Sequence, residues 1–121
     1  MEVLIVDDDE DICMILELIF KKKGWNTTYV TSGEKCLAWL KERQPDVVFL
    51  DLLMPSMSGD AVLKEMRRDQ KTTSTPVIFL TAKDVTPKER AELIAMGAQG
   101  VYTKPVDPLH VIESATQYLN K

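Results

Sequence analysis

Polar side chains follow four short apolar runs of this chain, at the points where buried strands would end. They are Asp7 and Asp8 after VLIV, Asp51 after VVFL, Thr81 after VIFL, and Lys104 after GVYT. Because the carboxyl ends of parallel strands lie at the same edge of a sheet, we expect these side chains to converge on one crevice. Three carboxylates, one hydroxyl and one ammonium suit a divalent cation together with a phosphoryl group.

The three carboxylates predict a bound metal ion. Two carboxylates about 4 Å apart repel by roughly 4 kcal/mol at the dielectric of a protein surface, so three together need a cation. A site with only oxygen ligands favours Mg²⁺ or Mn²⁺ over zinc, which prefers histidine or cysteine. The single histidine, His110, falls early in the last predicted helix, and we interpret it as an ordinary helix residue.

Asp51 is the candidate phosphoryl acceptor. An aspartate can form an acyl phosphate when a metal and a fixed cation neutralise the charge on the transferring oxygens. Asp51 ends the most apolar central strand and is followed by Pro55, whereas Asp7 and Asp8 are adjacent and suit the metal side. The alternative, a turn or helix-cap aspartate, would explain Asp51 alone and not the convergent groups.

Lys104 is the candidate cation for the phosphoryl group, since its ammonium would supply a point charge to phosphate. Pro105 stiffens the chain after it, and the Lys104–Pro105 bond is a candidate cis peptide. Thr81, taken alone, is equally well explained as an ordinary strand-end threonine. Lys83, two residues later, is expected to bring a positive charge near the same crevice.

The elements that position these groups alternate between strand and helix five times. Apolar residues at helical spacing predict a first helix that closes with lysines and Gly24. The other predicted elements are a polar strand at about 25–30, a helix ending before Pro45, a helix at about 60–69, a helix ending at Gly97, and a last helix carrying Leu109, Ile112, Ala115 and Leu119. Capping signals mark the helix starts at Asp9, Thr31 with Glu34, Thr86 with Pro87 and Glu89, and Asp107 with Pro108.

This alternation predicts one α/β domain over residues 1–121, with a doubly wound, five-stranded parallel sheet. Right-handed crossovers, and a central place for the three most apolar strands, favour the strand order 2-1-3-4-5. Strands 1 and 3 then flank the switch point of the sheet. Asp7, Asp8 and Asp51 are therefore expected to meet there.

The composition excludes several classes of protein. The hydrophobic share of 45% and the charged share of 28% are those of a soluble globular protein and not of a disordered or membrane-spanning chain. A net charge of -4 and a pI near 5.0 argue against direct nucleic-acid binding. The apolar stretch at the amino end is too short for a signal peptide, which favours the cytoplasm. Cys13 and Cys36 are interpreted as buried small hydrophobes.

With these residues in place, the chain resembles the receiver domains of two-component response regulators, which have a flavodoxin-like fold. Five ordered motifs carry the resemblance over the whole chain. They are Val6-Asp7-Asp8, the loop from Asp51 to Pro55 that continues through Met57 and Gly59 to Asp60, the strand from Pro76 to Ala82, Gly97-Ala98, and Tyr102 with Lys104 and Pro105.

The resemblance implies a role for each residue of the crevice. Asp51 would accept a phosphoryl group from a histidine kinase or a histidine phosphotransfer domain. Asp8 and Asp51 would bind Mg²⁺ directly, Asp7 would act through water, and the backbone carbonyl of Leu53 would complete the protein ligands.

The resemblance also implies a switch. Thr81 would swing to hydrogen-bond the phosphoryl group while Lys104 pairs with it. Tyr102 would follow inward and change the face built from the fourth helix, fifth strand and fifth helix. That face would control an effector or target protein. With no domain after Lys121, the chain is expected to be either a stand-alone receiver or one cut from a longer regulator or hybrid kinase.

Three alternatives remain beside this interpretation. Asp7-x-Asp9 superficially fits the opening of an aspartyl phosphatase, but no spare segment exists for its further motifs, so we do not expect an enzyme. No GxGxxG or Walker A sequence follows a strand, which disfavours a nucleotide or flavin module. A phosphorylation-independent interaction domain predicts no response to a small phosphodonor and Mg²⁺.

Overall fold

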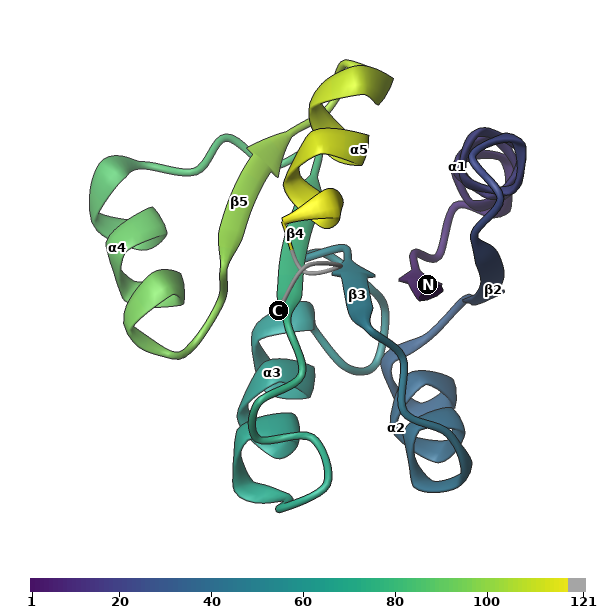
Figure 1. The fold of residues 1–121 in the computed structure, drawn as a ribbon. Helices are drawn as coiled ribbons and strands as arrows, with labels where there is room; N and C mark the ends of the chain where they lie inside the picture. Colours follow the sequence, from purple (N-terminus) through teal and green to yellow (C-terminus); the bar gives the residue numbers. More distant parts are fainter. Residues whose placement is uncertain (118–121) are drawn as a thin grey trace.

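The computed structural model describes residues 1–117. Five strands alternate with five helices, as the sequence predicts (Figure 1). The elements are β1 (Glu2–Val6), α1 (Glu10–Lys22), β2 (Asn26–Val30), α2 (Gly33–Glu42), β3 (Val47–Leu50), α3 (Gly59–Arg68), β4 (Val77–Thr81), α4 (Pro87–Ala95), β5 (Gly100–Thr103) and α5 (Pro108–Thr116). The predicted Leu119 of the last helix lies outside the described residues.

The strands form one parallel sheet in the order β2-β1-β3-β4-β5, which confirms the predicted doubly wound topology. Every residue of β3 and β4 is buried, as a parallel sheet covered on both faces requires. The more polar β2 lies at one edge. The order places the ends of β1 and β3 side by side, where the acidic residues were expected to meet.

Helices cover both faces of the sheet. On one face, α1 and α5 pack over a core that includes Phe20 stacked on Phe49, with ring centroids 5.2 Å apart. On the other face, α2, α3 and α4 cover a second core that includes Leu63 and Phe79. The sequence-predicted buried thiols are confirmed, with Cys13 in the first core and Cys36 in the second.

Local capping chemistry explains where α1, α4 and α5 begin. The predicted capping box of α4 is present: the Thr86 hydroxyl accepts from the Glu89 backbone N–H, and the Glu89 carboxylate accepts from the Thr86 N–H. Asp9 and Asp107 cap α1 and α5, as predicted.

The predicted cap of α2 is wrong by one residue. Ser32, not Thr31, is the N-cap, and its hydroxyl accepts from the backbone N–H of Lys35. Because Lys35 stands three residues after Ser32, the helix has a hydroxyl cap without the acidic partner of a capping box. The Thr31 hydroxyl instead lies 3.4 Å from the Lys35 ammonium.

Arg67 fixes the loop before β4 to the turn before β5. Its guanidinium donates to the backbone carbonyls of Thr72, Thr75 and Gly97, each at 2.8 Å. Gly97 has φ +110°, the left-handed conformation that glycine accommodates at a helix end.

Within residues 1–117, no helix has the length and apolar composition needed to cross a membrane.

Candidate functional site

Three functional side chains stand on backbone that still belongs to the sheet. The N–H of Asp7 donates to Val30 of β2 at 3.2 Å, and the N–H of Asp51 donates to Val6 of β1 at 2.9 Å. The N–H of Lys104 donates to Thr81 of β4 at 2.7 Å. Each residue directly follows its strand and is held by the neighbouring strand. The ladder therefore positions the side chains at the carboxyl edge before they contact one another.

The structure brings the predicted acids together. Carboxylate oxygens of Asp7, Asp8 and Asp51 all lie within 4.8 Å of one another. Asp7 and Asp51 are buried and Asp8 is exposed, so the cluster has a dry side and an open side. This arrangement confirms the predicted meeting of the three acids at the ends of β1 and β3.

Lys104 closes the buried side of the cluster. Its ammonium pairs with Asp7 and lies 3.8 Å from Oδ2 of Asp51. The side chain reaches this position from β5, across β4 and β3, and is only 14% exposed. The Lys104–Pro105 peptide bond is cis. One ammonium therefore faces two buried carboxylates, and the site keeps an excess of negative charge.

This excess of negative charge affects the pKa of Asp51. Burial, and next the charge of Asp7, raise the pKa of Asp51 from 3.8 to about 6, against the opposing effect of Lys104. The backbone N–H of Leu53 donates to Asp51 Oδ1 at 3.3 Å and favours the ionised form. Ionising Asp51 in this site is therefore unfavourable until more positive charge arrives.

The donor set fits a hard divalent cation. Three carboxylates with an exposed side that admits water match the oxygen coordination of Mg²⁺ or Mn²⁺. Within the cluster there is no sulfur or imidazole ligand, so zinc is disfavoured among the described residues. Leu53 follows two residues after Asp51, and the role of its carbonyl as a ligand stays a prediction.

Replacing Asp8 with asparagine should weaken Mg²⁺ binding about tenfold or more, because a charged ligand becomes neutral at the open side of the cluster. Calorimetric titration with Mg²⁺ measures the change. Asp11→Asn is the matched control: it removes the same charge from an exposed position in the first turn of α1. Equal effects of the two substitutions would mean that Asp8 acts only through long-range charge.

Thr81 has its side-chain hydrogen bond with the loop after β4 and not with the acids. It is fully buried, and its hydroxyl accepts the backbone N–H of Lys83 at 3.1 Å. Among the described residues, the structure shows no hydrogen bond between the Thr81 side chain and the side chains of Asp51 and Lys104. The predicted contact of Thr81 with a phosphoryl group stays a prediction.

Tyr102 lies on the opposite face of the sheet from Thr81. It pairs in register with Leu80 and is half-buried, packed against the core under α1 and α5. Because side chains alternate along a strand, Thr81 shares its face with Phe79 and, on β5, with Val101. The arrangement therefore does not fit the prediction that Tyr102 follows Thr81 inward.

The ring of Tyr102 instead lies close to Gly100 on the same strand. A Cβ added at Gly100 would come within 3.2 Å of the Tyr102 ring. The ring therefore lies back along β5 on the α5 side.

A glycine also allows the loop after Asp51 to pack tightly. A Cβ added at Gly59 would stand 2.3 Å from the backbone oxygen of Asp51 and 2.9 Å from the Phe79 ring. The Gly59 N–H donates to the carbonyl of Leu52 at 2.9 Å. Gly59 thus lets the first turn of α3 hold the Asp51 loop against the sheet.

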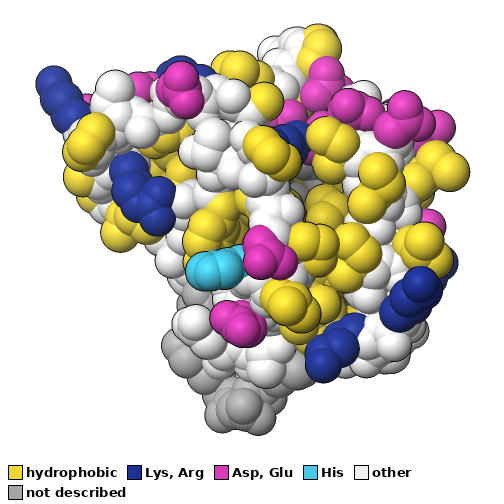
Figure 2. Space-filling view, turned by 90° about the horizontal axis from the view of Figure 1, so that it is seen from above, with side chains coloured by type: hydrophobic (Ala, Val, Ile, Leu, Met, Phe, Trp, Pro, Cys, Tyr) yellow, Lys and Arg dark blue, Asp and Glu magenta, His cyan; other side chains and the backbone are white. Residues whose placement is uncertain are grey.

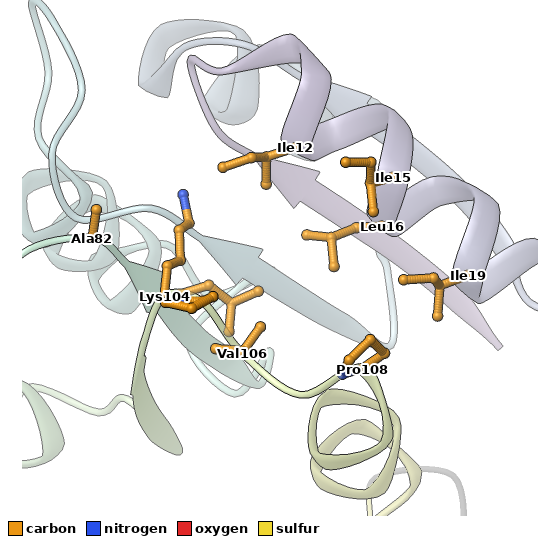
Figure 3. Close-up of a pocket in the computed structure, with 10 residues that line it drawn as sticks. Ile12, Ile15, Leu16, Ile19, Ala82, Lys104, Val106 and Pro108 are labelled. Atoms are coloured by element: carbon orange, nitrogen blue, oxygen red, sulfur yellow. The ribbon is translucent and has the colours of Figure 1, made fainter.

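An apolar groove of about 460 Å³ opens beside the cluster, between α1 and the segment that leads into α5 (Figure 3). Lys104 lines its end nearer to Ile12. The sequence pattern predicted Ile15 as part of the apolar stripe of the helix, yet it is 58% exposed, as is Leu18. Figure 2 shows apolar side chains gathered around a hollow on this side of the molecule, with acidic side chains beside them.

Comparisons with known proteins agree with this geometry. The family model of the response regulator receiver domain matches residues 3–116. The chain belongs to this family. As a receiver domain, it carries an acidic cluster of Asp7, Asp8 and Asp51 that can hold a metal ion of the kind its donor set favours.

Similar receiver sequences occur in longer regulators. The transcriptional regulatory protein YclJ of Bacillus subtilis is 32% identical over 93% of this chain and 48% of its own length. The sensory transduction protein RegX3 of Mycobacterium tuberculosis is 36% identical over 91% of this chain and 47% of its own. The chain therefore spans about half the length of these relatives.

Solved receiver structures share the fold closely. The receiver domain of the Francisella response regulator 1452 superposes with a TM-score of 0.90 at 28% identity, covering 98% of this chain and 96% of that one. The chemotaxis protein CheY4 of Vibrio cholerae gives a TM-score of 0.89 at 27% identity, covering 97% of each chain.

One element of the receiver site was not predicted. The Lys83 ammonium pairs with the Glu89 carboxylate at the start of α4. The sequence indicated the charge of Lys83, but the six-residue separation across a loop carries no contact signal. The apolar groove was also not predicted. The spacing of apolar residues indicated a helix, but it did not show which apolar side chains of α1 the rest of the protein covers.

Proposed function

We propose that this chain is a single phosphoacceptor domain over residues 1–121 that takes a phosphoryl group on Asp51 from a phosphohistidine. One observation carries the proposal: three carboxylates converge within 4.8 Å while the Lys104 ammonium lies 3.8 Å from Asp51. This is the charge distribution that an acyl phosphate and a divalent cation need. The donor would be a histidine kinase or a histidine phosphotransfer domain.

Transfer exchanges one bond for another. The P–N bond of the phosphohistidine breaks as a P–O bond forms to a carboxylate oxygen of Asp51, and the imidazole nitrogen keeps the electron pair of the broken bond. Mg²⁺, or Mn²⁺, would supply positive charge to the crowded oxygens. We assign Asp8 and Asp51 as direct ligands, Asp7 as a ligand through water, and the Leu53 carbonyl as a further ligand.

The other side chains act on the phosphoryl group. Lys104 already stands beside Asp51 and would pair with a phosphoryl oxygen, giving up part of its contact with Asp7. Thr81 would exchange its bond from the Lys83 N–H for one to the phosphoryl group. This exchange would shift the segment between β4 and α4, and through it the face made by α4, β5 and α5.

Tyr102 would sense that shift from the α5 side of the sheet. Its half-buried ring packs against the core under α1 and α5, so a movement of β5 would repack the ring. This route from Thr81 to Tyr102 is indirect. It replaces the predicted movement in which Tyr102 follows Thr81 inward.

The apolar groove gives the donor protein a place to lie. Asp51 is only 8% exposed, and we infer that the phosphohistidine enters at the open side of the cluster, where Asp8 is exposed. An apolar helix face of the donor would cover Ile15 and Leu18. We place these events in the cytoplasm, with no direct contact to nucleic acid. The effector or target protein would recognise the α4, β5 and α5 face.

Incubation with phosphoramidate or acetyl phosphate and Mg²⁺ tests the proposal. We expect a gain in mass of one phosphoryl group per chain, and no gain when EDTA removes the metal. Phosphoryl uptake should stop at one group per chain, apart from the slow loss of the bound group. No gain with Mg²⁺ would favour a phosphorylation-independent interaction domain, and rapid turnover of a phosphate ester would favour a phosphatase.

A further inference from the structure

The segment between β4 and α4 carries a cation that the proposed chemistry does not yet use. Lys83 follows Thr81 by two residues, and its backbone N–H donates to the Thr81 hydroxyl at 3.1 Å. Its ammonium points to Glu89 and pairs with that carboxylate. A shift of the backbone that follows Thr81 would therefore also move Lys83.

Lys83 and the Asp51 loop border the same hollow. It has a volume of about 200 Å³ and is lined by Leu52 and Leu53 on one side and by Lys83 and Glu89 on the other. Leu53 donates its N–H to Asp51 Oδ1, so the hollow begins next to the acceptor carboxylate. Lys83 is the only cation among the described residues that line it.

The charge of the site changes when Asp51 is phosphorylated. Three carboxylates and Lys104 leave two excess negative charges, which one Mg²⁺ would balance. An acyl phosphate carries up to about two negative charges in place of the single charge of Asp51. The phosphorylated site would therefore lack about one positive charge, which is the charge of Lys83.

Glu89 can release Lys83 at little cost. The pair is partly exposed, at 39% for the Lys83 side chain and 35% for Glu89, and ion pairs that water reaches contribute little to stability. Glu89 keeps a second partner, because its carboxylate also accepts the Thr86 N–H in the capping box of α4. A charge-assisted bond to a phosphoryl oxygen at a less exposed site is stronger than the exposed pair.

We propose that Lys83 is a second phosphoryl-binding residue, which Glu89 holds away from the site until Asp51 is phosphorylated. The role rests on the proposed function and deepens it. Because Lys83 leaves the start of α4, phosphorylation exposes the negative charge of Glu89 beside that of Glu92. The charge of the α4 surface thus changes on phosphorylation. This change needs no aromatic side chain on β5 on the face of the sheet that holds Thr81, where Val101 lies.

Binding of beryllium fluoride, a tetrahedral analogue of the phosphoryl group, tests this role in the presence of Mg²⁺. Lys83→Gln should weaken binding about tenfold, and Lys83→Arg, which keeps the charge, should restore it. Glu89→Gln should tighten binding about threefold, because it frees Lys83 while glutamine can still complete the capping box. The double variant should match Lys83→Gln.

Controls separate this role from a structural one. Glu65→Gln breaks a comparable exposed pair with Arg68 on α3 and should leave the affinity unchanged. Thermal unfolding of each variant shows whether the fold is retained. Tighter binding by Glu89→Gln cannot result from a damaged fold, and the loss of that gain in the double variant shows that it depends on Lys83.

Two results would overturn the role of Lys83 alone: unchanged affinity in Lys83→Gln, or weaker binding in a folded Glu89→Gln. Wild-type protein that binds no beryllium fluoride with Mg²⁺ would overturn the proposed function, and the role of Lys83 with it.

Discussion

Replacing Asp51 with asparagine should abolish phosphorylation and, at the same time, stabilise the metal-free fold at neutral pH. The pKa of Asp51 rises from 3.8 to about 6 because the carboxyl is buried beside Asp7. A rise of that size corresponds to roughly 3 kcal/mol that folding loses when Asp51 ionises. Asparagine carries no charge and can still accept the Leu53 N–H, so the variant avoids this loss.

The sign of the pH dependence follows from the raised pKa. The stabilising contribution of protonated Asp51 is present below pH 4 and is lost as the pH rises through 6. Denaturant unfolding of wild type and Asp51→Asn in EDTA should therefore give similar stabilities near pH 4. Above pH 7 the variant should be more stable by up to about 3 kcal/mol.

Asp69→Asn provides the control for the Asp51 substitution. Asp69 lies at the opposite end of α3 from the Asp51 loop, and asparagine there can still accept the Lys71 N–H. This variant should take up a phosphoryl group normally and show no comparable pH-dependent gain. A folded Asp51→Asn that is less stable than wild type at pH 7.5 would contradict the electrostatic account of the site.

Replacing Lys104 with methionine should have effects of opposite sign on metal binding and on phosphorylation. The methionine removes the ammonium that faces Asp7 and Asp51. The site becomes more negative, so Mg²⁺ should bind about tenfold more tightly. Phosphorylation by a small phosphodonor should nevertheless slow by about a hundredfold, because the transferring oxygens lose a fixed cation.

The same substitution should destabilise the metal-free fold by about 3 kcal/mol at neutral pH, since it leaves two buried carboxylates without their partner. Saturating Mg²⁺ should recover much of that loss. Lys64→Met, at an exposed position of α3, is the matched control and should change neither affinity nor rate. Weaker Mg²⁺ binding in Lys104→Met would show that the ammonium does not compete with the metal for the acids.

The strand ends explain why so much of the acidic site could be predicted. Runs such as VVFL are buried on both faces, so their position along the chain defines the strand and the residue that follows it. The strand order then places Asp51 beside Asp7, and no side-chain geometry is needed for that step. The same reasoning identified the lysine that follows β5.

The features that were not predicted depend on register and on loop shape. Whether Tyr102 or Val101 faces Thr81 depends on the pairing of Leu80 with Tyr102, and the sequence of β5 is too short and mixed to show it. The pair of Lys83 with Glu89 depends on the path of the loop before α4. These two features changed the proposed route from the acceptor to α4.

Trapping the modified residue tests the central claim most directly. Wild-type protein treated with phosphoramidate and Mg²⁺ can be reduced with borohydride, which converts an aspartyl phosphate to homoserine, and then mapped by peptide mass spectrometry. We predict homoserine at position 51 and nowhere else in the acidic cluster. Homoserine at position 7 or 8, or no homoserine in protein that has gained a phosphoryl group, would contradict Asp51 as the acceptor.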